Sequence, residues 1–302
     1  MNAAVLQPPA ARHGPGPLPQ PLIDALDVAV NRLVTRTLPG DRRAAGVGIG
    51  TELAQLRPYE VGDDVRHIDP AATARSGQPH VRQHVPDRAL STWILLDVSP
   101  SMAFGTARRL KADVAEGVAL VFGRLGVRRA GSVGLVAFGA GAPRVLAPRG
   151  SKPGIVALRR TLAEGVAPDG QHQPEGFADA LRRVARLARQ PGLVVVISDL
   201  RDQRGWERPL GSLRIRHSVL VVEISDPRER QLPAVGHLVL VDPETGERID
   251  VDTSRRRVRE RFAELEQERR AGVARELRRL RIDHVPVSTD EDWLLALGRY
   301  LR

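Results

Sequence analysis

The 302-residue sequence contains no cysteine, which excludes disulfides, thiolate metal sites and a catalytic thiol. Aromatic residues make up only 3% of the chain, so its core must consist mainly of Leu, Val, Ala and Ile. No apolar run approaches the roughly 20 residues of a transmembrane helix, and residues 1–21 lack the apolar segment of a secretory signal. From these absences we expect a soluble, cytoplasmic protein without membrane insertion.

Lysine is almost as scarce as cysteine. The formal net charge is +10, yet Lys111 and Lys152 are the only lysines and arginine supplies the remaining basic groups. A basic balance is compatible with nucleic acid or with an acidic protein partner. Charge alone specifies no element that reads a groove, so we predict no nucleic-acid partner and keep an arginine-driven nucleic-acid binder as a third hypothesis. A steep loss of binding with added salt would support that hypothesis.

Composition and periodicity divide the chain into three parts. Residues 1–21 are rich in Pro, Ala and Gly and are predicted to form a disordered tail. Residues 22–90 are predicted to be an appended segment, with a helix over 22–38 and an irregular stretch that includes an extended piece at 79–85. Residues 91–302 alternate apolar runs with amphipathic helices. This pattern predicts a Rossmann-like three-layer α/β domain with a mostly parallel sheet, on which the appended segment packs.

Within residues 91–302 the apolar runs predict strands and the helical periodicity predicts helices. The expected strands are 93–96, 132–138, 144–147, 193–197, 218–224 and 282–287, with a hairpin over 239–251. The expected helices are 107–125, 155–162, 175–189, 255–280 and 290–301. A sheet of this kind places its ligand site at the carboxyl ends of the strands, so functional side chains are expected there.

The sharpest pattern follows the first of these strands, in the sequence Asp97-Val-Ser99-Pro-Ser101. Three short oxygen-bearing side chains at alternate positions of one tight turn can converge on a point, and Mg²⁺ prefers oxygen ligands. Asp199 ends the strand at 193–197 and supplies a second carboxylate. Helix capping would explain either aspartate alone. Their joint occurrence directly after apolar strands favours a site for Mg²⁺ or Mn²⁺.

These residues resemble the metal-ion-dependent adhesion site of von Willebrand factor A domains. A second motif lies upstream and reads Tyr59-x-x-Gly62-Asp63-Asp64-x-Arg66-x-Ile68-Asp69, followed by Ala74-Arg75. Together with the Leu-Asp-Val-Ser-x-Ser-Met-x-Phe-Gly run that ends at Gly105, it is similar to the domain-of-unknown-function 58 family. The resemblance runs from about residue 46 to the carboxyl terminus. It implies a von Willebrand factor A-like domain that works with a MoxR-type AAA+ ATPase in assembling or maturing protein complexes.

The chain departs from these patterns at two places. The adhesion site usually includes a threonine before the second acidic strand, whereas the stretch from Gln173 to Leu181 contains none. Glu175 lies nearest to the expected place, so the metal site is predicted to be either more acidic than usual or degenerate. The other departure is Pro70, where the family usually has an aromatic residue. It is expected to loosen a packing contact.

In the similar domains the metal keeps one open position, which an acidic side chain of a partner fills. We therefore predict a non-enzymatic, metal-dependent protein-binding module that acts as an adaptor. Met102 and Phe104 either contact the partner or pack beneath the site. The charged residues of the upstream motif are interpreted as structural Arg–carboxylate pairs, with a partner surface as the other option. The alternative function is a metal-dependent phosphoryl hydrolase at Asp97 and Asp199. It is weakened by Ser99, which stands where such enzymes generally carry a second carboxylate.

Overall fold

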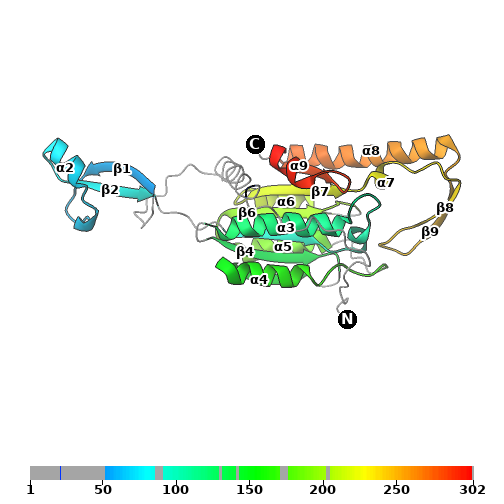
Figure 1. Ribbon diagram of the computed structural model, residues 1–302, viewed down its shortest axis with the longest axis horizontal. Coiled ribbons are helices and arrows are strands. Elements are labelled where there is room, and N and C mark those ends of the chain that lie inside the picture. The colour runs from blue at the N-terminus through cyan, green and yellow to red at the C-terminus, as the bar shows by residue number, and fades with distance from the viewer. Residues whose placement is uncertain are drawn as a thin grey trace. The chain divides into compact units, whose positions relative to one another are not determined.

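The computed structural model describes residue 21 and residues 52–85, 91–128, 131–140, 143–170, 176–201 and 205–300 of the chain (Figure 1). Its contacts divide the chain into two units, one formed by Gly40–Ala89 and the other by Met1–Pro39 together with Leu90–Arg302. Three predictions lie outside the described residues: the disordered tail (residue 21 apart), the helix over 22–38 and the metal ligand Glu175.

The smaller unit is built on an antiparallel pair of strands, β1 (Glu52–Pro58) and β2 (His80–Val85). The segment between them contains a short 3-10 helix, η1 (Val65–His67), and the helix α2 (Pro70–Ser76). Pro70 is therefore the first residue of a helix, where the missing N–H costs no hydrogen bond.

The carboxylates of the upstream motif hold this unit together. Asp69 begins α2: one of its oxygens accepts a hydrogen bond from the Ala72 amide at 2.7 Å, and the other accepts one from Arg82 Nε at 2.7 Å. Asp63 receives two hydrogen bonds from the Arg57 guanidinium, at 2.6 and 2.8 Å. Both arginines lie outside the motif. Further members of the motif differ in their roles: Asp64 caps η1, Tyr59 donates its amide to the Pro79 carbonyl, Gly62 has a φ of 114°, and Arg66 and Arg75 are exposed.

The larger unit contains a six-stranded sheet with the order β10-β7-β6-β3-β4-β5. All neighbouring strands are parallel except β5, which runs antiparallel to β4. The strands are β3 (Ser91–Asp97), β4 (Ser132–Phe138), β5 (Arg144–Gly150), β6 (Gly192–Ser198), β7 (Ser218–Ser225) and β10 (Asp283–Ser288).

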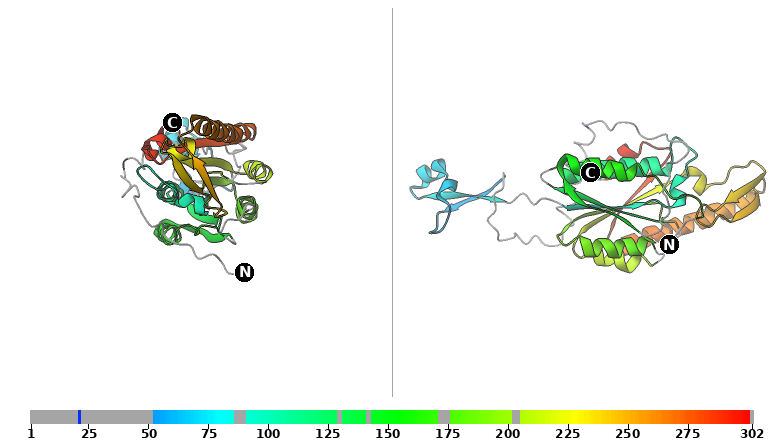
Figure 2. Two further views of the ribbon diagram at one scale, coloured as in Figure 1. Left: turned by 90° about the vertical axis from the view of Figure 1, so that its right-hand side faces the viewer. Right: turned by 90° about the horizontal axis from the view of Figure 1, so that it is seen from below.

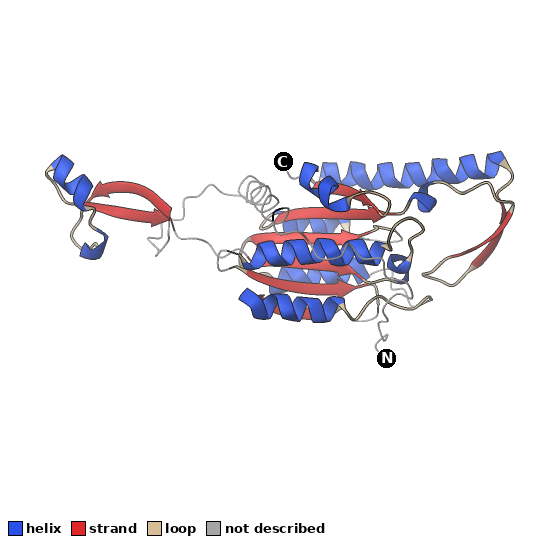
Figure 3. Cartoon of the chain, in the orientation of Figure 1, coloured by secondary structure: helices blue, strands red, loops and turns tan. Residues whose placement is uncertain are grey.

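Helices cover both faces of this sheet (Figures 2 and 3). Side chains of α3 (Lys111–Val127), α4 (Ser151–Leu162) and α9 (Trp293–Tyr300) share one hydrophobic core with one face. Side chains of α5 (Gly176–Leu187), α6 (Glu207–Arg214) and α8 (Arg256–Arg279) share a second core with the other face. Successive residues of β3 alternate between the two cores, with Ile94 in the first and Leu95 in the second. The predicted three-layer α/β domain is confirmed.

The sheet reverses its order between β3 and β6. From β3 the chain passes through α3 to β4 on one side, and later reaches β6 on the other side. The two strand ends on either side of this switch point carry Asp97 and Asp199. Open α/β sheets hold their ligands at such a point, beyond the carboxyl ends of the strands.

One further element extends from this unit. The strands β8 (His237–Val241) and β9 (Arg248–Asp252) form an antiparallel hairpin of their own, between the short helix α7 (Pro227–Arg230) and α8. The predicted hairpin is therefore present, although both strands differ by a residue or two from the expected range. The predicted helix at 107–125 begins later, at Lys111, because the backbone before it forms a loop.

Candidate functional site

The turn after β3 gathers the three side chains of the Asp-x-Ser-x-Ser motif. The Asp97 carboxylate accepts a hydrogen bond from the Ser99 amide at 3.0 Å through one oxygen. Its other oxygen accepts one from the Ser198 hydroxyl at 2.5 Å, which ties the ends of β3 and β6 together. The hydroxyls of Ser99 and Ser101 lie 3.2 Å apart. All three motif side chains are buried, and they lie on one turn as the sequence pattern predicts.

A glycine on the next strand end makes room for this turn. Gly139 follows β4 and has a φ of 96°, in the region that favours glycine. A Cβ at this position would lie 2.8 Å from the Cβ of Ser99 and 3.0 Å from Asp97 Oδ1. Val98, inside the motif, also donates its amide to the Phe138 carbonyl at 2.9 Å and accepts from the Ala167 amide at 2.7 Å. The backbone of the turn is thus fixed from two sides.

The Asp97 carboxylate is buried, and its electrostatic environment differs from that of Asp199. Its burial, together with the nearby charge of Asp199, raises its pKa to about 7, although hydrogen bonds from Ser198 and Ser99 act in the opposite direction. Among the described residues no lysine or arginine forms an ion pair with Asp97. The raised pKa means that the ionised form of this carboxylate is disfavoured, so a bound cation would stabilise it.

Asp199, in contrast, has a resident cation. The Lys111 ammonium lies 2.6 Å from Asp199 Oδ2 and 2.6 Å from Glu229 Oε1, and its side chain is 0% exposed. Burial alone would raise the pKa of Asp199, but Lys111 and the Arg201 amide outweigh it and hold that pKa below its usual range. Burial alone would lower the pKa of Lys111, but the carboxylates of Asp199 and Glu229 hold it above its usual range. Lys111 is therefore charged where it lies.

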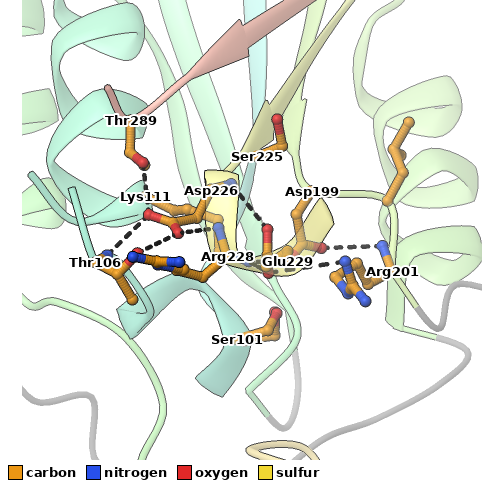
Figure 4. A network of polar contacts seen from close by, with 12 residues as sticks. Ser101, Thr106, Lys111, Asp199, Arg201, Ser225, Asp226, Arg228, Glu229 and Thr289 are labelled. Carbon is orange, nitrogen blue, oxygen red and sulfur yellow. Dashed lines mark hydrogen bonds and ion pairs between the residues drawn. The ribbon is translucent and has the colours of Figure 1, made fainter. Parts of the chain in front are cut away.

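Sequence reasoning missed Lys111 and its second partner, Glu229, which Figure 4 shows together with Asp199. A signal existed, because Lys111 is one of only two lysines in a chain that otherwise uses arginine. Lysine and arginine are not interchangeable at such a buried position, because the ammonium is a compact charge and the guanidinium a planar, extended one. Glu229 carries no such signal, since it belongs to a short helix after β7 that the sequence pattern did not reveal.

A second polar cluster next to Lys111 fixes the loop that precedes α3. Asp226 is fully buried and accepts hydrogen bonds from the Thr106 amide at 2.8 Å and the Thr106 hydroxyl at 2.6 Å (Figure 4). It also accepts from the Thr289 hydroxyl at 2.6 Å and the Arg228 amide at 2.9 Å. These contacts explain why residues 104–110 form a loop and α3 begins only at Lys111.

A further residue that the sequence did not reveal reaches the motif from the β8–β9 hairpin. The Ser101 amide donates a hydrogen bond of 2.9 Å to Glu244 Oε1, and Glu244 is only 8% exposed. The two residues are 143 positions apart in the sequence. Spacing along the chain gives no indication of such a contact.

At this edge of the sheet, the residues around Asp97 fit a small hard cation and those around Asp199 do not. Asp97, Ser99 and Ser101 offer a carboxylate without a cationic partner and two adjacent hydroxyls, which suits Mg²⁺ or Mn²⁺. Asp199 is already neutralised by Lys111. Within the described ranges no three His, Cys, Asp or Glu side chains form an arrangement that could hold a metal ion. A metal here would therefore depend on the serine hydroxyls.

The two apolar residues beside the motif have different environments. Met102 is fully buried within the core that contains α3, so of its two predicted roles the structure supports packing beneath the site and not contact with a partner. Phe104 is 39% exposed, and Lys111 Nζ lies 5.9 Å from the centre of its ring. Phe104 alone of this pair presents apolar surface next to the site.

Most of the sequence matches a family model. The model of the family described as "Protein of unknown function DUF58" matches residues 55–272. The chain belongs to this family. An uncharacterized protein from Mycobacterium tuberculosis is 37% identical to this DUF58 chain over 306 residues, which covers 99% of this chain and 94% of the relative. The family predicted from the paired motifs is thus confirmed.

Two solved structures illustrate what this DUF58 chain is similar to in three dimensions. An aerotolerance-related membrane protein from Bacteroides fragilis has a TM-score of 0.43 at 18% identity, with 70% of this chain and 98% of that chain covered. The SpRpn10 VWA domain has a TM-score of 0.37 at 15% identity, with 69% and 93% covered.

The expected cytoplasmic location is contradicted, because similar structures include this membrane protein from Bacteroides fragilis. We do not maintain that expectation. In the described part of the chain, every helix is too short or too polar to span a membrane.

Proposed function

We propose that this chain is a metal-dependent protein-binding module. In this proposal Mg²⁺ or Mn²⁺ binds directly to Asp97, Ser99 and Ser101, while Asp199, which is already paired with Lys111, is the second acidic group near the site. Glu175 is retained as a further proposed ligand. The observation that carries the proposal is the buried Asp97 carboxylate, which lies on one turn with two adjacent hydroxyls and whose pKa is raised to about 7 by burial and by the charge of Asp199.

The chain's own residues would divide the work between them. Asp97 and the two serine hydroxyls supply the oxygen ligands, and the Ser198 hydroxyl and the Ser99 amide orient the carboxylate. Lys111 keeps Asp199 ionised and fixed at 2.6 Å. A bound metal would supply a positive charge that attracts an acidic side chain of the partner, and the exposed ring of Phe104 would add apolar contact beside it.

The partner class that we propose is a MoxR-type AAA+ ATPase, with this chain as its adaptor in the assembly or maturation of protein complexes. The family resemblance supports this choice, and the acidic ligand would lie on the ATPase or on its client protein. Hydrolase chemistry is not favoured, because Ser99 stands two residues after Asp97 and pairs with Ser101, so Asp97 has no neighbouring carboxylic acid on this turn.

Calorimetric titration of Mn²⁺ and Mg²⁺ into the wild type, Asp97→Asn and Asp250→Asn tests the proposal. Asp250 is an exposed residue of β9, so its variant serves as a control for a lost surface charge. We expect saturable binding by the wild type and by Asp250→Asn, and none by Asp97→Asn. Equal binding by all three would show that the metal binds elsewhere. Absence of binding by the wild type, alone and with a MoxR-type ATPase added, would refute metal dependence.

A further inference from the structure

The tip of the β8–β9 hairpin places an acidic side chain on the metal-binding turn. Glu244 lies in the turn between the two strands, and its Oε1 accepts the Ser101 amide at 2.9 Å. Its side chain is 8% exposed, whereas Val239 and Ile249 on the strands behind it are 58% and 60% exposed. The neighbouring turn residues Asp242, Thr245 and Gly246 are exposed as well, so Glu244 is the buried residue of the tip.

The turn itself holds Glu244 in this position. Asp242 accepts hydrogen bonds from the Glu244 amide at 2.9 Å and, through its carbonyl, from the Gly246 amide at 2.7 Å. Gly246 has a φ of 76°, which suits glycine in such a turn. The Pro243 carbonyl accepts the Gly170 amide at 2.9 Å, which attaches the tip to a loop beside the site. The carboxylate is therefore presented in a fixed geometry.

We propose that Glu244 is the resident acidic ligand of this site, and that it occupies the position which an acidic side chain of a partner must take. This inference rests on the proposed function, since it assigns Glu244 to the same metal as Asp97, Ser99 and Ser101. A partner then binds only by displacing the tip of the hairpin, and Glu244 acts as a built-in competitor.

Charge supports the coupling between the metal and the hairpin. The Glu244 carboxylate is hydrogen-bonded to the turn that carries Asp97, so a divalent ion held by that turn would attract it. A divalent ion should therefore strengthen the docking of the tip, and the docked tip should strengthen metal binding by the same factor. A partner carboxylate sees only the fraction of molecules in which the tip is released, so its apparent affinity is reduced by that fraction.

Mn²⁺ binding followed by water-proton relaxation tests this inference in four proteins: the wild type, Glu244→Gln, Glu247→Gln and Asp97→Asn. Glutamine can still accept the Ser101 amide but carries no charge, so the tip keeps its hydrogen bond and loses its value as a ligand. Glu247 is exposed on the same turn region and provides the matched control. We expect Glu244→Gln to bind Mn²⁺ on the order of 10- to 100-fold more weakly than the wild type.

The relaxation signal distinguishes a ligand from a mere hydrogen-bond partner. In Glu244→Gln a water molecule takes the vacated position, so the relaxation per bound Mn²⁺ should rise. Excess acetate, as a probe for the partner's carboxylate, should reverse this rise and leave the wild type unchanged. Hydrogen exchange gives a second readout: Mn²⁺ should slow exchange of amides 242–247 in the wild type but not in Glu244→Gln.

The outcomes separate the two proposals. If the wild type binds no Mn²⁺, the proposed function fails and this inference fails with it. If the wild type binds and Asp97→Asn does not, but Glu244→Gln matches Glu247→Gln in affinity, relaxation and exchange, the metal site stands and Glu244 is not its ligand.

Discussion

Replacing Asp97 by asparagine should make the metal-free protein more stable at neutral and alkaline pH. An asparagine has the shape of the protonated acid. In the native protein Ser99 and Ser198 each contact one oxygen of the Asp97 carboxylate. The asparagine oxygen can accept a hydrogen bond from the Ser99 amide, and its NH₂ group can donate one to the Ser198 hydroxyl. The variant thus keeps the hydrogen bond from Ser99, reverses the direction of the one with Ser198, and removes a buried charge with which no described lysine or arginine forms an ion pair.

The sign and size follow from linkage. The pKa of Asp97 is about 7 in the folded protein and 3.8 in an ordinary environment, so the folded state holds its proton more tightly. The resulting stabilisation is fully present below about pH 4 and is lost as the pH rises through about 7. One pKa unit corresponds to about 1.4 kcal/mol, so a difference of about three between the folded and unfolded states contributes about 4 kcal/mol to the free energy of unfolding. Asp97→Asn does not lose this contribution.

Urea unfolding in the presence of a chelator, from pH 5 to pH 8.5, measures the effect. Tryptophan fluorescence reports on the larger unit alone, because the chain's three tryptophans are Trp93, Trp206 and Trp293. We expect Asp97→Asn to gain about 3 kcal/mol on the wild type across this range, most of it below pH 7 and little more above pH 7, because the rest of the effect falls between about pH 4 and pH 5. A constant difference across this range, or a variant less stable than the wild type at pH 8, would refute the reasoning. Mn²⁺ should reverse the order at pH 8, because only the wild type binds it.

Three further predictions concern groups around the site and in the smaller unit. Lys111→Met leaves the buried Asp199 and the partly buried Glu229 without their shared lysine and should lower the free energy of unfolding by about 3–5 kcal/mol. Lys152→Met, an exposed control, should change it little, and similar urea midpoints for the two variants would contradict this. Gly139→Ala should both destabilise the protein and weaken Mn²⁺ binding. The control Gly170→Ala also has a positive φ but no atom within 4 Å of the added Cβ, so it should lose only roughly 1–2 kcal/mol through backbone strain. Equal Mn²⁺ affinities of the two variants would count against a close fit at the turn. Asp69→Ala removes a helix cap and an arginine pair and should cost the smaller unit about 1–2 kcal/mol, measured by hydrogen exchange within residues 52–85; unchanged exchange would show that the cap is dispensable.

Much of the fold could be predicted because its signals are local. The solid Val, Ile and Leu runs that became β6 and β7 indicate strands buried on both faces, and the charged 24-residue helix α8 was expected to within a residue at each end. The strand β1 and the helix α2 were missed, because a small unit has a weak hydrophobic pattern. The start of α3 was placed too early, since Thr106 is held by Asp226, 120 residues away.

The site was predictable only where neighbours in the sequence are neighbours in space. Asp97, Ser99 and Ser101 lie on one turn, and Asp199 follows a strand whose end adjoins the same point, so topology alone brought them together. Lys111, Glu229 and Glu244 come from a helix, a short turn of helix and a hairpin tip. Their contacts depend on how those elements pack, which periodicity does not specify.

The burial of Lys111 has a practical consequence for attaching this protein to a surface. Amine-reactive reagents need an accessible lysine, and of the two in the chain only Lys152 is exposed. Because β5 runs antiparallel to β4, Gly150 pairs with Ser132 at the end of the sheet opposite Asp97, and Lys152 follows two residues later. Apart from the amino terminus, Lys152 is therefore the one amine available for chemical coupling. A sensor chip prepared in this way would present the Asp97 edge uniformly to the solution.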